Sequence, residues 1–90
     1  MEVNVILENK FQEADKHLLE KRYQKAYDLL QEILKEDPVF GKAYNHLGWL
    51  FETKYRRHQE AENFYKLAMK HSPEYLPTYY NYAIVLSTHQ

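Results

Sequence analysis

The side chains that could do catalysis or hold a metal ion are spread along this sequence without the spacing such sites need. The five histidines are His17, His46, His58, His71 and His89. No two of them lie four residues apart, and neither an H-E-x-x-H motif nor a Cys–His ligand spacing occurs. Phosphate-binding glycine loops and Gly-x-Ser-x-Gly elbows are also missing. We therefore expect a protein that is not an enzyme and that uses no metal or cofactor.

Composition narrows the class of partner. The 90 residues make one domain at most, and an apolar fraction of 44% suffices for a folded core. A net charge of -1 gives no field strong enough to gather nucleic acid or anionic lipid. The short basic cluster at 54–58 is interpreted as a solvated turn, since no sustained basic stripe accompanies it. Neither nucleic acid nor a membrane is an expected partner.

The chain has no cysteine, which excludes disulfides and thiolate sites and is compatible with a reducing compartment. Residues 1–10 resemble neither a signal peptide nor a membrane span. The default expectation is a cytoplasmic protein.

The sequence repeats itself with an offset of 35 residues, and the matching positions agree in size as well as polarity. Tyr44, Leu47, Gly48 and Phe51 recur as Tyr79, Tyr82, Ala83 and Leu86. Ala26, Leu29, Leu30, Ile33, Leu34 and Pro38 recur as Ala61, Phe64, Tyr65, Ala68, Met69 and Pro73. A fixed period in the thirties indicates stacked supersecondary units, none of which can bury its apolar face alone.

Apolar spacing is helical almost throughout and predicts five helices, at about 3–20, 23–36, 42–54, 59–71 and 77–89. Pro38 and Pro73 end the second and fourth, and Pro77 suits the start of the fifth. Gly48 in a helix interior costs roughly 1 kcal/mol relative to alanine, so we expect close packing with the next helix near Ala61 to offset it.

These residues resemble the tetratricopeptide repeat family. Its signature reads here as Tyr44-x2-Leu47-Gly48-x2-Phe51, then Ala61-x3-Tyr65, then Pro73. The resemblance covers residues 1–90 as a single domain, with repeat 1 at about 3–38, repeat 2 at about 41–73 and a half repeat, interpreted as truncated, at about 76–90. It implies an all-α fold in which helix-turn-helix repeats stack as a right-handed α-solenoid. It also implies a concave groove, lined by the first helix of each repeat, that binds a peptide or partner protein.

Two parts of the chain fit the signature less well. In the first helix, Phe11-x2-Ala14-Asp15-x2-Leu18 keeps the apolar stripe but puts Asp15 at the small-residue site. Shifting by one residue corrects that site, yet it puts Lys10, Glu13 and His17 at apolar sites. The turn around residues 55–58 is expected to be longer than its counterpart, because Leu18 precedes Ala26 by eight residues and Phe51 precedes Ala61 by ten.

Helical geometry, applied to the implied groove, selects the residues opposite each core stripe. The predicted groove residues are Gln12, Lys16, Lys42, Asn45, Trp49, Glu52, Tyr80, Asn81 and Ile84, and the same stripes hold Glu13, His46, Pro77 and Ser87. Buried aromatics dominate binding hot spots, and an amide can hold a ligand backbone. Trp49 and Tyr80 could instead pack on each other between repeats, and both alternatives stay open. A carboxylate clamp of the kind some family members have is not expected, since Pro77 and Asn81 stand where basic groups would be needed.

The fifth helix has few polar positions, although the last helix of a repeat array normally has a polar outer face. We therefore expect self-association, as a possible homodimer, through Tyr82, Ile84, Val85 and Leu86. The main functional hypothesis is a non-enzymatic interaction module that binds a protein or peptide in its groove. The alternative is a structural unit that oligomerises through the fifth helix.

Overall fold

The computed structural model describes residues 4–88 and shows five α-helices in that range, with no strand among the described residues. The helices are α1 (Val5–Leu19), α2 (Tyr23–Glu36), α3 (Gly41–Thr53), α4 (His58–His71) and α5 (Pro77–Thr88). The expected all-helical class and five helices are confirmed, with boundaries within two residues. The expected start at Val3 and the end at His89 lie outside the described residues.

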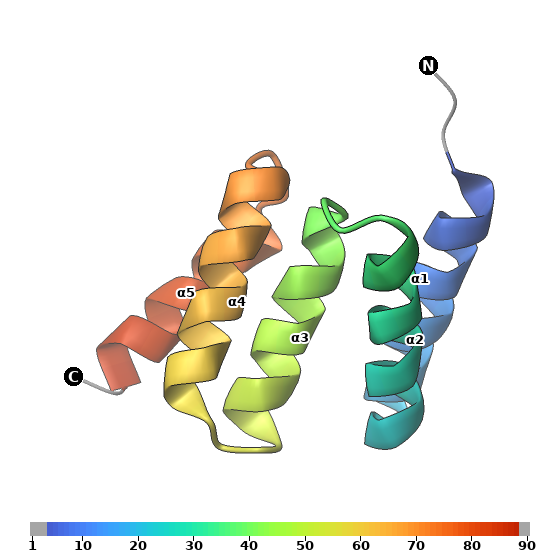
Figure 1. The fold of residues 1–90 in the computed structure, drawn as a ribbon. Coiled ribbons are helices and arrows are strands. Elements are labelled where there is room, and N and C mark those ends of the chain that lie inside the picture. The colour runs from blue at the N-terminus through green and yellow to red at the C-terminus, as the bar shows by residue number, and fades with distance from the viewer. Residues whose placement is uncertain (1–3, 89–90) are drawn as a thin grey trace.

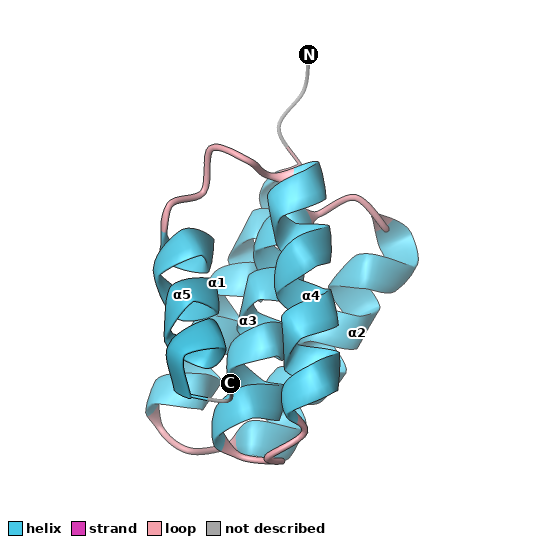
Figure 2. Cartoon of the chain, turned by 90° about the vertical axis from the view of Figure 1, so that its left-hand side faces the viewer, coloured by secondary structure: helices cyan, strands magenta, loops and turns pink. Residues whose placement is uncertain are grey.

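The helices form two rows (Figure 1). The closest packing is within the hairpins α1–α2 and α3–α4, and α2–α3, α4–α5 and α3–α5 contacts join the units. Seen along the row, α1 and α5 lie on one side of α3, and α2 and α4 lie on the other (Figure 2). Packing between neighbouring helices is consistent with a helical repeat.

The turns repeat with the same offset as the sequence. The hydroxyl of Tyr44 donates to the carbonyl of Pro38 at 2.7 Å, and that of Tyr79 donates to Pro73 at 2.6 Å. Lys21 and Arg56, also 35 residues apart, have positive φ angles of 63° and 58°. The periodicity therefore extends to backbone conformation and turn hydrogen bonds.

The two intra-hairpin turns differ in length as expected. Three residues separate α1 from α2, and four separate α3 from α4. In the first turn the amide of Arg22 donates to the carbonyl of His17 at 2.8 Å, and that of Lys21 donates to Leu18. This pair is the Schellman pattern around a left-handed residue. In the second turn the amide of Arg57 donates to Phe51, which spans one residue more.

The core is built from small and large residues that alternate across the hairpins. The expected stripes of α1, Leu7, Phe11, Ala14 and Leu18, and of α2, Ala26, Leu30 and Ile33, are buried. Gly48 lies against the ring of Tyr65, since a Cβ at Gly48 would be 2.6 Å from Tyr65 Cε1. The close approach of α3 and α4 is confirmed, with the Tyr65 ring as the contact. Tyr44, which the sequence places in the core, is only half-buried because its hydroxyl reaches the turn.

The α5 helix corrects one part of the self-association hypothesis. Val85 is only 3% exposed and belongs to the core, so it cannot contact a second copy. Tyr82 is half-buried against the Tyr65 ring, at 6.3 Å between centroids. The large apolar side chains that α5 does expose are Tyr79, Tyr80, Ile84 and Leu86. The reason is that α5 packs on α4 and α3 through Val85, which turns Tyr80 and Ile84 outward.

No helix within residues 4–88 combines the length and the apolar character that crossing a membrane requires.

Candidate functional site

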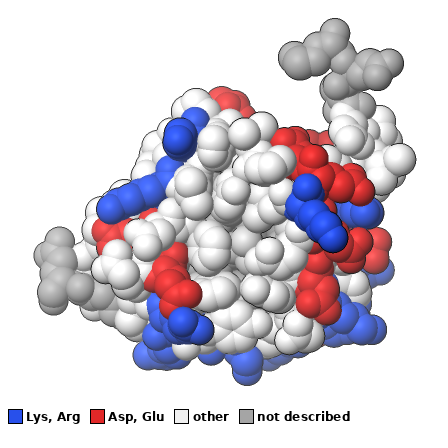
Figure 3. All heavy atoms as spheres, viewed as in Figure 1, with Lys and Arg blue, Asp and Glu red and all other residues white. Residues whose placement is uncertain are grey.

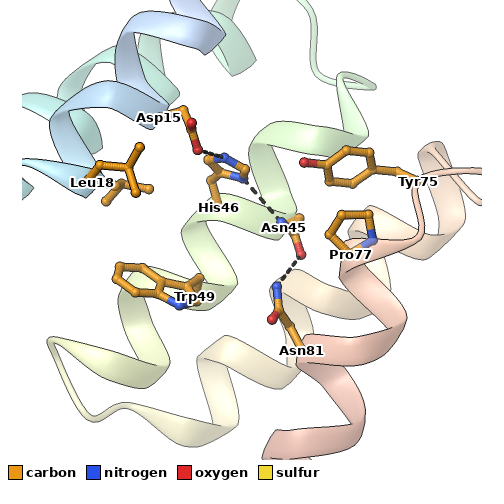
Figure 4. Close-up of a pocket in the computed structure, with 9 residues that line it drawn as sticks. Asp15, Leu18, Asn45, His46, Trp49, Tyr75, Pro77 and Asn81 are labelled. Carbon is orange, nitrogen blue, oxygen red and sulfur yellow. Dashed lines mark hydrogen bonds and ion pairs between the residues drawn. The ribbon is translucent and has the colours of Figure 1, made fainter.

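Three helices, α1, α3 and α5, surround a pocket of about 360 Å³ together with the turn before α5. Its lining residues are Asp15, Leu18, Leu19, Asn45, His46, Trp49, Tyr75, Pro77 and Asn81 (Figure 4). The volume falls in the range of roughly 300–1,000 Å³ that is usual for small-ligand sites. Each of the first helices of the repeating units contributes side chains.

A chain of hydrogen bonds crosses one wall of this pocket (Figure 4). Asn81 Nδ2 donates to Asn45 Oδ1 at 3.1 Å, which leaves Asn45 Nδ2 as a donor for His46 Nδ1 at 3.2 Å. A neutral imidazole that accepts at Nδ1 carries its proton on Nε2. His46 Nε2 then donates to Asp15 Oδ1 at 3.0 Å. The donors therefore all run in one direction, from α5 through α3 to α1.

Burial decides the charge of His46. The side chain is only 8% exposed, and this burial lowers the pKa of His46 even though the hydrogen bond and charge of Asp15 act to raise it. His46 is thus neutral at pH 7. Because both of its ring nitrogens are engaged, its role in the pocket is to hold Asn45 and Asp15 in place.

The hydroxyl of Tyr75 faces the same space from the turn between α4 and α5 (Figure 4). Burial, and then the charge of Asp15, raise the pKa of Tyr75. The hydroxyl therefore stays protonated and can donate as well as accept a hydrogen bond.

The remaining wall is apolar. Leu18 and Pro77 lie on either side of Trp49, whose indole is half-buried (Figure 4). Leu19 is 77% exposed at the edge of the pocket. An apolar surface beside a few fixed polar groups is the usual make-up of a recognition site.

The structure brings together only part of the predicted groove. Asn45, Trp49 and Asn81 line the pocket, together with His46 and Pro77 from the same stripes. Lys42 lies beside it, with its ammonium 3.6 Å from Glu8 Oε1 and 5.8 Å from the Tyr75 ring centroid.

Other predicted groove residues do not line the pocket. Tyr80 and Ile84 are exposed on α5 outside its lining. Glu52 points to the α3–α4 turn, where its Oε1 lies 2.5 Å from His58 Nδ1. Asn45 is only 3% exposed, so most of its hydrogen-bonding capacity serves the fold.

The register of α1 is the main correction. Gln12, Glu13 and Lys16 are exposed and do not line the pocket, whereas Asp15 does. Ala14 is fully buried and occupies the small-residue site, so Asp15 is the counterpart of Trp49. The polar residues that argued against this register reach solvent along α2, as the ion pair of Lys10 with Glu32 at 3.5 Å illustrates.

Leu18 and Leu19 are further lining residues that the sequence reasoning missed. The signal that could have found them is the pair Ala14–Asp15, a small residue followed by one that cannot be in the core. The same order occurs in α3 as Gly48–Trp49.

Two other surfaces offer less. A second hollow, of about 600 Å³, is lined by α2 residues alone, including Tyr27, Gln31 and Leu34. On the face shown in Figure 3, charged side chains lie toward the edges and the middle is uncharged. Within residues 4–88, no group of three or more histidine, aspartate or glutamate side chains is placed to hold a metal ion.

No protein-family model matches this chain, and a search of curated proteins finds no significant match.

Proposed function

We propose that this chain is a protein-interaction module without catalytic activity, of the tetratricopeptide type, that binds a peptide segment in the pocket between α1, α3 and α5. The observation that carries the proposal is the position of Trp49. Its half-buried indole lies beside the fixed amides of Asn45 and Asn81, on the face to which the first helix of every unit contributes. Aromatic anchors next to amides of fixed orientation are suited to holding a peptide side chain and its backbone.

The repeated turn geometry supports the family part of the proposal. Equivalent bonds from Tyr44 and Tyr79, and equivalent left-handed residues at 21 and 56, are expected if each unit is related to the next by one constant rotation and translation. Continued in the same way, such units form a right-handed superhelix whose concave side holds the pocket. A chain without cysteine suits a reducing compartment, which favours the cytoplasm.

Selection from a random heptapeptide library displayed on phage tests this function. We expect peptides that bind the wild-type chain and lose at least about tenfold in affinity with Trp49→Ala, because the anchor side chain is removed. Gln31→Ala is the control, since this exposed residue lies on α2 away from the pocket. Peptides that bind both variants equally would place the binding surface elsewhere.

Self-association through α5 is the second candidate function, and the exposed apolar side chains of that helix favour it. Tyr80 is 72% exposed, Ile84 42% and Leu86 39%. A two-fold contact would bury the same patch on both copies. Sedimentation of wild type and Leu86→Glu at high micromolar concentration tests it: a dimer that the substitution dissociates supports the candidate, and a monomeric wild type contradicts it.

A further inference from the structure

The charges and acceptors of the pocket between α1, α3 and α5 indicate which kind of side chain it accommodates. Among its nine lining residues, Asp15 carries the only formal charge, since His46 is neutral at pH 7. The Asp15 side chain keeps about half of its exposure, 52%, although one oxygen accepts from His46. A carboxylate can accept several hydrogen bonds, so Asp15 has capacity left for a ligand.

The hydrogen-bond chain also fixes which end of Asn81 is free. Because Asn81 Nδ2 donates to Asn45, the remaining acceptor of that amide is Oδ1. Figure 4 shows Asn81 with this oxygen directed away from Asn45 and toward the side of the pocket where Trp49 lies. The pocket thus offers two acceptors, one of them ionised, from opposite walls.

Aromatic surface lies between these acceptors. Trp49 and Tyr75 both line the pocket, and Trp is the side chain whose face attracts cations most strongly. The nearest basic group of the fold, Lys42, already pairs with Glu8 and therefore does not neutralise Asp15. Acceptors, one negative charge and aromatic faces together complement a cation.

We propose that the pocket binds an arginine side chain of the partner peptide, with its guanidinium between Asp15 and Asn81 Oδ1 and its plane against Trp49. A guanidinium fits better than an ammonium because its planar donors can reach two acceptors while the flat face stacks on a ring. This inference rests on the proposed peptide-binding function and adds the identity of the anchor residue.

Apolar side chains on both sides of the pocket favour a peptide over a free small cation. Ile84 follows Pro77 and Asn81 along one stripe of α5, and Leu19 extends the edge formed by α1. Residues flanking the arginine would pack against these exposed positions.

Small probes test the cation part without any peptide. Butylguanidinium and its uncharged isostere butylurea are titrated into the ¹⁵N-labelled full chain, and the Trp49 indole and the Asn81 side-chain amide are followed by NMR. We expect butylguanidinium to bind about tenfold more tightly than butylurea. Asp15→Asn should remove this difference. Glu13→Gln should retain it, because this exposed carboxylate on the same helix lies outside the pocket.

Equal affinities for the two probes in the wild type, or no shift of the Trp49 and Asn81 signals with butylguanidinium, would overturn the arginine proposal. Such a result leaves the proposed peptide-binding function to its own test, since selected peptides could still depend on Trp49. A capped Leu-Arg-Leu peptide should bind more tightly than butylguanidinium. Equal binding of these two would overturn the peptide part and assign the pocket to a free cation.

Discussion

The ring of Tyr65 lies where a Cβ atom at Gly48 would have to be, with Tyr65 Cε1 only 2.6 Å from that position. Helix propensity and packing therefore make opposite predictions for one substitution. In an exposed helix Gly→Ala would stabilise by roughly 1 kcal/mol. Here we expect Gly48→Ala to destabilise the fold by about 1–3 kcal/mol, and Gly48→Leu by more, as overpacking does.

Urea unfolding followed by circular dichroism measures this effect. Adding Tyr65→Leu to Gly48→Ala should reduce the penalty that Gly48→Ala imposes, because the clashing ring is gone. A midpoint unchanged or raised by Gly48→Ala would show that α3 and α4 are further apart than described.

Thr78 offers a stabilising change. It is fully buried, and its hydroxyl has no hydrogen-bond partner among the described residues. Its counterpart 35 residues earlier is Ala43, which is equally buried and has no hydroxyl. Thr78→Val keeps the shape and removes the unpaired group, so we expect a gain of about 1 kcal/mol in the free energy of unfolding. A lower melting temperature for Thr78→Val would indicate that the hydroxyl has a partner.

Stability should fall on acidification because of His46. Burial lowers its folded-state pKa below the ordinary value of 6.5. As the pH falls below 6.5, the unfolded chain takes up a proton at this side chain that the folded chain does not bind, so the free energy of unfolding decreases. The loss continues until the pH reaches the folded-state pKa. Melting temperatures between pH 7.5 and about 5 should fall less steeply for His46→Gln than for wild type. Equal slopes would contradict the assignment of His46 as a neutral buried side chain.

The two left-handed turn residues should tolerate glycine. Lys21 and Arg56 have φ angles of 63° and 58°, a region that costs a residue with a Cβ about 1–2 kcal/mol. Glycine avoids this cost but loses more backbone entropy, so Lys21→Gly and Arg56→Gly should each stabilise by about 0.5 kcal/mol. Lys25→Gly, in the exposed interior of α2, is the control and should destabilise by about 1 kcal/mol. Thermal unfolding that shows the same loss for all three variants would contradict the described turns.

Local patterns were sufficient to predict the helices. Prolines 38, 73 and 77 mark three boundaries because their effect on backbone geometry is intrinsic. The core stripes follow from helical periodicity, as the buried Leu7, Phe11, Ala14 and Leu18 illustrate.

The pocket required information that the sequence does not contain. Asn45 and Asn81 are 36 residues apart, and their contact depends on the rotation between successive units. Polar residues along α1 are tolerated because they reach solvent beside α2, and this misled the choice of register at Asp15. The burial of Val85 likewise depends on how α5 settles against α4 and α3, which its nearly continuous apolar sequence does not reveal.

The most direct test of the binding pocket is the fluorescence of Trp49, the only tryptophan of the chain. A peptide selected against the wild type is titrated into it while calorimetry measures binding on the same samples. We predict a blue shift of the Trp49 emission that saturates with the dissociation constant found by calorimetry, since the ligand removes water from the half-buried indole. Saturable heat with no change in Trp49 emission would mean that the peptide binds elsewhere, and it would contradict the account.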